Sequence, residues 1–188
     1  MTKSILVVGV GGQGTILASK ILTTGLMEAG YDVKMSEIHG MSQRGGSVSS
    51  QIRFGECVQS PVIDKKSAEV LISFEKMEAL RWSDYVKEDG LIVVNNEEIP
   101  SMSVITGAEK YADDVLEKIR GVAEVKVVEA TKIAEELGNA KAANIVLLGT
   151  IIKSMNLEEI DWESIIRDNV KAAFVELNLK ALEAGMNA

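Results

Sequence analysis

The sequence SILVVGVGGQG occupies residues 4–14 and joins an apolar stretch to a glycine-rich turn. Residues 4–10 are almost continuously apolar, which is typical of a strand buried on both faces of a parallel sheet. Residues 15–29 then carry leucine and isoleucine at helical spacing, and Gly30 is the residue expected to end that helix. A strand, a glycine turn and a helix in this order predict the opening unit of a Rossmann-like fold.

The rest of the chain alternates between apolar, strand-like runs and helical patterns. Residues 47–54 follow the strand at 31–38 with no helix between them, so we expect an antiparallel or edge addition to the sheet. The other predicted strands are residues 70–74, 90–95 and 123–129, and the predicted helices are residues 75–82, 111–119, 131–137, 144–155 and 162–169, the last running on to 184. The predicted fold class is α/β, a Rossmann-like, mostly parallel sheet with flanking helices and a helical C-terminal third, in one domain over residues 1–188.

Composition and charge exclude several classes of protein. The chain has 188 residues, 46% of them hydrophobic and 26% charged, so it can bury a core and is not disordered. Its 28 acidic and 20 basic residues give a formal net charge of −8, which opposes binding to nucleic acid or to an anionic membrane. No apolar run approaches the roughly 20 residues of a membrane span. We expect a cytoplasmic protein.

The count of ligating side chains limits what the chain can hold. One cysteine, Cys57, and one histidine, His39, cannot supply the ligands of a zinc site or an iron–sulfur cluster. Cys57 lies in an irregular stretch and is interpreted as a plain loop cysteine. The sequence therefore assigns no catalytic residue and no metal ligand to this chain.

The glycine-rich turn is the first candidate binding site. Missing side chains let the backbone turn sharply and approach a ligand, while the N–H groups and dipole of the following helix favour an anion. The alternative is that the glycines only permit a tight turn with close packing. The candidate cofactor-binding residues of this turn are Gly9, Gly11, Gly12, Gln13, Gly14 and Thr15.

Glu37 raises the question of a dinucleotide. It lies near the end of the second predicted strand, roughly where an NAD-binding protein places the carboxylate that binds ribose, and is a further candidate cofactor-binding residue. However, Gly12 is an extra glycine in the motif, and a glycine-rich loop follows Glu37 where a helix would be expected. A free-standing NAD- or nucleotide-binding protein stays the alternative function, and Glu37 is equally interpretable as a carboxylate that stabilises the loop.

The segment after Glu37 is the most unusual part of the chain. It places an imidazole, a hydroxyl, an amide and a guanidinium on a loop that contains three glycines. Polar loops at the carboxyl end of a strand commonly line the ligand crevice of an open α/β sheet. Arg44 could bind a phosphate or carboxylate group, or it could pair with Glu37. The candidate substrate or partner loop comprises His39, Gly40, Met41, Ser42, Gln43, Arg44, Gly45 and Gly46.

The two motifs together resemble those of a known family. The sequence VVGVGGQG at residues 7–14, followed by SEIHGMSQRGG at residues 36–46, is similar to the gamma-type subunits of 2-oxoacid:ferredoxin oxidoreductases. Within that family the chain resembles most the beta subunits of the indolepyruvate enzymes. Asn144 and the later Phe174 and Asn178 resemble positions in the C-terminal helices of the family, so the likeness covers essentially the whole chain.

This resemblance implies an enzyme whose active site is shared between chains. Such complexes oxidatively decarboxylate a 2-oxoacid, here an aryl pyruvate such as indolepyruvate, and release an acyl-CoA. Thiamine diphosphate and [4Fe–4S] clusters would belong to a large alpha-type partner subunit, from which electrons pass to ferredoxin. The present chain would bind no cofactor alone and would be inactive in isolation. Its glycine turn and the loop around Arg44 would face the active site or the path of CoA.

Overall fold

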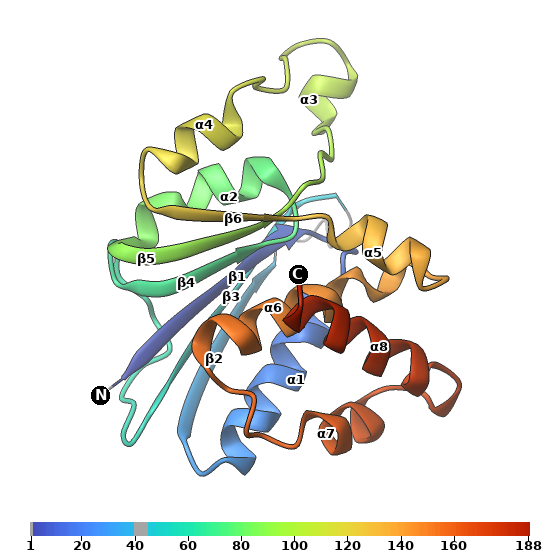
Figure 1. Cartoon of the computed structure of the whole chain (residues 1–188). Helices are drawn as coiled ribbons and strands as arrows, with labels where there is room; N and C mark the ends of the chain where they lie inside the picture. Colours follow the sequence, from blue (N-terminus) through green and yellow to red (C-terminus); the bar gives the residue numbers. More distant parts are fainter. Residues whose placement is uncertain (1, 40–44) are drawn as a thin grey trace.

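The computed structural model describes residues 2–39 and 45–188, in which six strands form one sheet in the order β2-β3-β1-β4-β5-β6 (Figure 1). The strands are β1 Lys3–Val10, β2 Asp32–His39, β3 Ser47–Gly55, β4 Ala68–Ser73, β5 Val86–Asn95 and β6 Glu124–Val128. Neighbouring strands from β1 through β4 and β5 to β6 pair in parallel, whereas β3 is antiparallel to both of its neighbours. The predicted α/β class with a mostly parallel sheet is confirmed.

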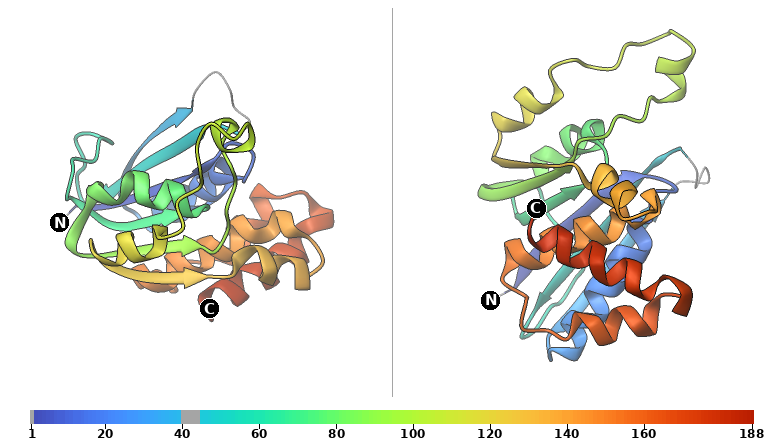
Figure 2. Two further views of the ribbon diagram at one scale, coloured as in Figure 1. Left: turned by 90° about the horizontal axis from the view of Figure 1, so that it is seen from above. Right: turned by 45° about the vertical axis from the view of Figure 1, so that its right-hand side comes forward.

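Helices cover both faces of this sheet (Figures 1 and 2). One face carries α1 (Thr15–Glu28), α5 (Ala130–Glu136), α6 (Ala143–Met155), α7 (Trp162–Asn169) and α8 (Val175–Met186), and the other carries α2 (Lys76–Trp82) and α4 (Val115–Arg120). A further short helix, α3 (Met102–Ile105), stands away from the sheet in the segment between β5 and α4. Within the described residues, no helix is long and apolar enough to cross a membrane.

The first strand lies at the centre of the core, as its apolar sequence predicts. Ile5 and Val7 pack into the cluster under α1, and Leu6 and Val8 pack into the cluster under α2. All four side chains are fully buried. Since successive side chains of a strand point to opposite faces, only a strand covered on both sides needs such an uninterrupted apolar run.

The position of β3 refines the expected topology. The strand is antiparallel, as one of the two predicted arrangements has it, but it lies inside the sheet between β1 and β2 and does not form an edge. In consequence, β2 becomes the edge strand. The register places Glu37 opposite Ser50, and Ser50 opposite Val7 of β1.

Two helix predictions are wrong in part. The helix predicted at residues 111–119 begins only at Val115, because Tyr111 is occupied in a contact with Glu75 of the preceding strand–helix junction. The helix predicted to run from residue 162 to 184 is interrupted after Asn169. Val170 is extended, a 3₁₀ turn follows at Ala172–Phe174, and α8 starts at Val175. Neither glycine nor proline marks that break, which explains why the sequence pattern missed it.

Candidate functional site

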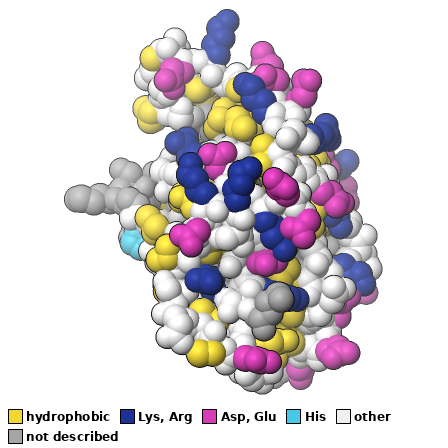
Figure 3. All heavy atoms as spheres, turned by 90° about the vertical axis from the view of Figure 1, so that its left-hand side faces the viewer, with side chains coloured by type: hydrophobic (Ala, Val, Ile, Leu, Met, Phe, Trp, Pro, Cys, Tyr) yellow, Lys and Arg dark blue, Asp and Glu magenta, His cyan; other side chains and the backbone are white. Residues whose placement is uncertain are grey.

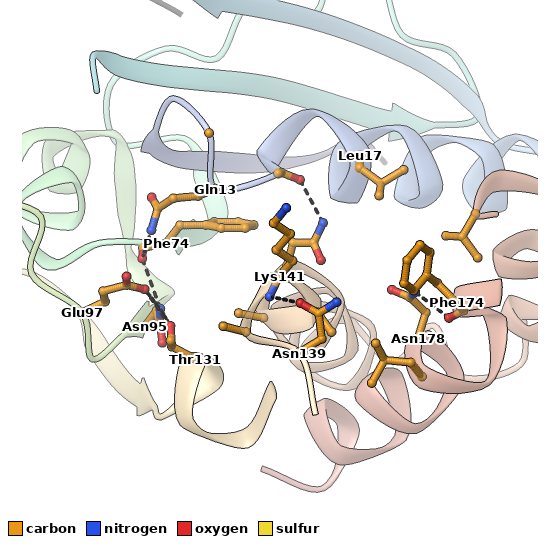
Figure 4. A pocket seen from close by; sticks show the side chains of 18 of the residues that line it. Gln13, Leu17, Phe74, Asn95, Glu97, Thr131, Asn139, Lys141, Phe174 and Asn178 are labelled. Atoms are coloured by element: carbon orange, nitrogen blue, oxygen red, sulfur yellow. Dashed lines mark hydrogen bonds between the residues drawn. The ribbon is translucent and has the colours of Figure 1, made fainter. Parts of the chain in front are cut away.

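A cavity of about 660 Å³ opens at the carboxyl ends of β1, β4 and β5, beneath the C-terminal helices (Figure 4). In an open α/β sheet this edge, outside the carboxyl ends of the strands, is where ligands bind. The side chains and backbone that line the cavity are those of Gly12, Gln13, Gly14, Leu17, Phe74, Asn95, Glu97, Thr131, Asn139, Ala140, Lys141, Ala142, Ala143, Asn144, Asn169, Val170, Lys171, Phe174, Leu177 and Asn178. Three of the predicted turn residues, Gly12, Gln13 and Gly14, are among them.

The glycine turn owes its shape to two left-handed residues. Gly12 has φ +108° and Gly14 has φ +83°, a conformation that L side chains rarely adopt. A Cβ on Gly12 would meet nothing within 4 Å, so this side of the turn is open toward the cavity that it lines. A Cβ on Gly9 would instead lie 2.9 Å from both Gln13 Oε1 and Phe74 Cβ. The turn therefore combines close packing at Gly9 with open space at Gly12.

Gln13 has a structural role that the sequence did not reveal. Its Oε1 accepts a hydrogen bond from the backbone N–H of Val10 at 2.8 Å, and its Nε2 donates to the carbonyl of Phe74 at 2.9 Å. The side chain thus joins the end of β1 to the residue that follows β4. The oxygen and the nitrogen of this side-chain amide are thus both bonded to the backbone. What the turn offers a ligand is the backbone of its glycines.

Asn144 connects the start of α1 to the start of α6. It is buried, and its Nδ2 donates to the carbonyl of Gly14 at 3.3 Å. The same atom lies 2.6 Å from where a Cβ on Gly14 would be, so only glycine fits at that position. The first turn of α1 is thereby held at the wall of the cavity, where its N–H groups and dipole favour an anion.

A second polar group lies at the carboxyl ends of β5 and β6. Buried Asn95 donates through Nδ2 to Glu97 Oε2 at 2.8 Å and to Thr131 Oγ1 at 3.0 Å, and it accepts from the backbone N–H of Ala130 at 3.0 Å. The Thr131 hydroxyl donates to the same Glu97 oxygen at 2.6 Å. Glu97 is therefore a half-buried carboxylate fixed in orientation by two neighbours, at one end of the cavity (Figure 4).

Basic and amide side chains come from the helical third. Lys141 and Lys171 line the cavity and are exposed to solvent. The backbone N–H of Lys141 donates a hydrogen bond to Asn139 Oδ1 at 3.0 Å. Between them and the glutamate lie apolar groups, including Phe74, and Phe174 lies farther along (Figure 4). The cavity can therefore receive an elongated ligand that is anionic at the lysines and the α1 terminus.

The ends of the predicted partner loop lie against the glycine turn. The N–H of Gly11 donates to the carbonyl of Gly46 at 2.8 Å, and the N–H of Gly45 donates to the carbonyl of Gly11 at 3.1 Å. His39 is exposed at the end of β2. The remaining loop residues, Gly40, Met41, Ser42, Gln43 and Arg44, lie outside the described residues. The two sequence motifs are thus joined at Gly11.

Glu37 is not placed as a ribose-binding carboxylate would be. It is exposed on the edge strand β2, and β3 separates it from β1. Strands lie about 4.8 Å apart, so Glu37 is about 10 Å from β1, whereas a dinucleotide-binding protein places β2 directly beside β1. The inserted strand counts against the nucleotide-binding alternative.

Several lining residues were missed at the level of sequence. Asn95 and Glu97 follow the apolar run of β5 directly, and polar residues at the carboxyl end of a buried strand were a usable signal. Thr131 lies in α5, Lys141 in a 3₁₀ turn before α6 and Lys171 in the break after α7, and none of the three carried such a signal. They reach the cavity only because the C-terminal helices fold back over the sheet edge.

The fold and the cavity together define a doubly wound α/β protein with a cavity at the carboxyl edge of its sheet. Residues 4–188 match the family described as pyruvate ferredoxin/flavodoxin oxidoreductase. The chain belongs to this family, and the gamma-type membership expected from its two motifs is confirmed. It is therefore a subunit of an oxidoreductase that acts on 2-oxoacids with ferredoxin as acceptor.

Two full-length relatives are subunits named for indolepyruvate. The chain is 40% identical to indolepyruvate oxidoreductase subunit IorB of Archaeoglobus fulgidus, over 100% of this chain and 95% of that protein. It is 36% identical to the IorB subunit of Thermococcus kodakarensis, over 98% and 95%. A more distant relative, 29% identical over 92% and 89%, is the common gamma subunit of the pyruvate/ketoisovalerate oxidoreductases of Pyrococcus abyssi.

Solved structures share the fold. The gamma subunit of a keto/oxoacid ferredoxin oxidoreductase from Geobacter sulfurreducens superposes with a TM-score of 0.74 at 23% identity, covering 100% of this chain and 95% of that one. Pyruvate oxidoreductase subunit PORC from Thermotoga maritima gives 0.73 at 22% identity, covering 99% and 96%. At these identities the two structures support the architecture alone.

Proposed function

We propose that this chain is the small, beta-type subunit of an indolepyruvate:ferredoxin oxidoreductase, in which an aryl pyruvate is oxidatively decarboxylated to an acyl-CoA. The observation that carries the proposal is the 40% identity to an IorB subunit over the whole chain. The gamma subunit of pyruvate/ketoisovalerate enzymes is only 29% identical. The balance of these identities favours an aryl over an alkyl 2-oxoacid. In this proposal residues 1–188 act as one domain, in the cytoplasm.

The proposal includes a large alpha-type partner subunit. A [4Fe–4S] cluster takes four ligands, usually cysteines, and this sequence has one cysteine and one histidine. The residues present therefore do not fit a cluster, and we assign the clusters and thiamine diphosphate to the partner. Electrons would leave to ferredoxin from that subunit, and the present chain would complete the enzyme by binding and shaping part of its site.

Within that complex, we assign the cavity at the carboxyl edge to the anionic part of CoA. The residues fit such a group, because the α1 terminus, Lys141 and Lys171 line a space that the Gly12 backbone leaves open. Gly9, Gly11, Gly12, Gly14 and Thr15 shape this wall, and Gln13 fixes it to β4. The loop from His39 to Gly46 is assigned to the partner or the substrate, since its base is bonded to the same turn.

The test is reconstitution with a purified large, alpha-type subunit from the same source. The isolated chain should be colourless and inactive. Mixed with the purified partner, it should restore CoA-dependent reduction of a viologen dye with indolepyruvate in preference to pyruvate. Iron–sulfur absorbance in the pure, reconstituted single chain, or equal activity of the partner alone, would contradict the proposal.

A further inference from the structure

The segment between β5 and α4, residues 96–114, projects from the sheet and carries the most exposed apolar side chains of the described chain. In Figures 1 and 2 it leaves the end of β5, reaches α3 far from the core and returns to α4. Met102 is 71% exposed and Ile105 is 65% exposed. Single exposed apolar residues are ordinary on a protein surface, whereas these two lie together on a projecting element and form a small apolar patch that is free for contact.

The base of this projection is anchored firmly. Glu75, which is buried at the start of α2, accepts hydrogen bonds from the Tyr111 hydroxyl and from the backbone N–H of Ile99 at 3.3 Å. Lys76 forms an ion pair with Glu98 at 2.6 Å. Both arms of the segment are thus held to the same helix terminus. These contacts fix the base of the projection relative to α2.

The tip is ordered by its own polar contacts. The Ser103 hydroxyl donates to Glu109 Oε2 at 2.6 Å, and the backbone N–H of Glu109 donates to the carbonyl of Ser103 at 3.1 Å. The Thr106 hydroxyl donates to the carbonyl of Met102 at 2.9 Å. Met102 and Ile105 are three residues apart on this helical turn and therefore point to the same side. The contacts hold the turn so that its apolar side faces water.

Charge distinguishes the possible occupants. Residues 96–114 contain five carboxylates and one lysine, in a chain whose net charge is −8. Asp113 is exposed on this segment. A second copy of the chain would bring the same acidic surface and would be repelled, whereas a partner with basic residues would be attracted. On the upper part of the molecule, where the segment lies, Figure 3 shows hydrophobic and acidic side chains together with a smaller number of lysine or arginine side chains.

We infer that residues 96–114 form a docking knob, in which Met102 and Ile105 enter an apolar pocket rimmed by lysine or arginine on the large partner subunit. The inference rests on the proposed function, because it requires that partner. Short helical turns commonly bind by inserting two or three apolar anchors into a groove, and methionine adapts well to such pockets. The acidic flanks would steer the encounter and fix the orientation of the knob.

The experiment is a binding titration of the full chain against the purified large subunit. The variant Met102→Ser/Ile105→Ser should bind roughly thirty-fold more weakly, the loss expected when interface anchors are truncated. A matched control is Met27→Ser/Val62→Ser, which removes two other side chains that are each 55% exposed. The control should bind as the unmodified chain does. The melting temperatures of both variants should stay unchanged, which separates a docking defect from unfolding.

The possible results of this titration separate a failure of the docking knob from a failure of the proposed function. If the knob variant binds as tightly as the control, the knob is not a docking element. If the unmodified chain fails to bind the large subunit at all, the proposed function fails, and the knob with it. Asp113→Lys tests the basic rim separately: the association rate should fall several-fold and lose part of its salt dependence. An unchanged or faster association rate would show that the partner surface is not basic.

Discussion

Gly185 of α8 lies directly against the backbone of Val146 in α6: a Cβ on Gly185 would be 1.9 Å from the Val146 carbonyl oxygen. The reverse contact is similar, since a Cβ on Gly149 would be 2.3 Å from the carbonyl oxygen of Leu182. The Thr150 hydroxyl donates to the Gly185 carbonyl at 3.1 Å across the same interface. The close approach of these two helices determines where the C-terminal third lies over the cavity.

Gly185→Ala should therefore destabilise the chain by about 3 kcal/mol, because the methyl group must push two helix backbones apart. The measurement is urea unfolding followed by circular dichroism. Glu183→Ala, at an exposed position of the same helix, is the control and should change stability by less than about 0.5 kcal/mol. Equal stability of the two variants would mean that α6 and α8 can separate without cost.

The sequence predicted the fold better than the site, for a physical reason. The apolar run of β1 and the glycines after it are local signals: the run alone predicts that the strand is buried, and the glycines alone predict the tight turn. The location of β3 inside the sheet is not local, because it depends on which strand edge the returning chain pairs with. The missing crossover helix predicted that β3 could pair antiparallel, but nothing in the sequence showed that β1 and β2 would be the strands beside it.

In the candidate site too, contiguous features could be predicted from the sequence, whereas residues brought together by folding could not. The glycine turn was found because its pattern is contiguous, whereas Glu97 and Lys141 are 44 positions apart and line one cavity only in the folded chain. Gln13 was read as a ligand-binding residue of the motif, and its side chain instead bonds Val10 and Phe74. A sequence motif shows which residues cluster along the chain. It does not show which of them the backbone itself uses.

Gln13→Ala tests that structural role. The truncation leaves the Val10 N–H and the Phe74 carbonyl without their partner, so the free chain should lose about 1–3 kcal/mol of unfolding free energy. Chemical denaturation of the isolated chain measures this, with exposed Gln59→Ala as the control. A variant with normal stability and impaired reconstituted activity would return Gln13 to the ligand-binding residues.

Tyr111 gives a prediction for alkaline pH. Burial and the neighbouring Glu75 carboxylate hold the pKa of Tyr111 above its ordinary value. A tyrosine in the unfolded chain ionises near pH 10, whereas the folded phenol stays protonated, so its contribution is complete below pH 10 and is lost as the pH rises further. The free energy of unfolding should therefore fall above about pH 10 more steeply in the unmodified chain than in Tyr111→Phe. Parallel curves for the two proteins would show that the hydroxyl is not held as described.

NADH should not stabilise the chain. Glu37 is separated from β1 by β3, so the ribose-binding geometry of a dinucleotide site is missing. A ligand that binds only the folded state raises the melting temperature by mass action. We expect no shift at millimolar NADH in thermal unfolding. A saturable increase would revive the nucleotide-binding alternative.

The lysines of the cavity provide the sharpest test of its assignment to CoA. Lys141 and Lys171 are exposed, and both line the cavity that also contains the α1 terminus. If they contact the anionic groups of CoA, Lys141→Gln/Lys171→Gln should raise the KM for CoA by roughly ten-fold in the reconstituted enzyme. The rate at saturating CoA should change little, because neither residue is assigned to the chemistry, and the KM for the 2-oxoacid should stay the same.

The salt dependence of the KM for CoA gives a second measurement. Added salt should raise this KM more in the unmodified enzyme than in the variant, because salt screens the attraction between the lysines and CoA, and the variant lacks those lysines. Lys180→Gln, an exposed lysine of α8 outside the cavity lining, is the matched control. An unchanged KM for CoA in the double variant, or a KM raised equally by Lys180→Gln, would show that the ligand of this cavity is not the anionic part of CoA.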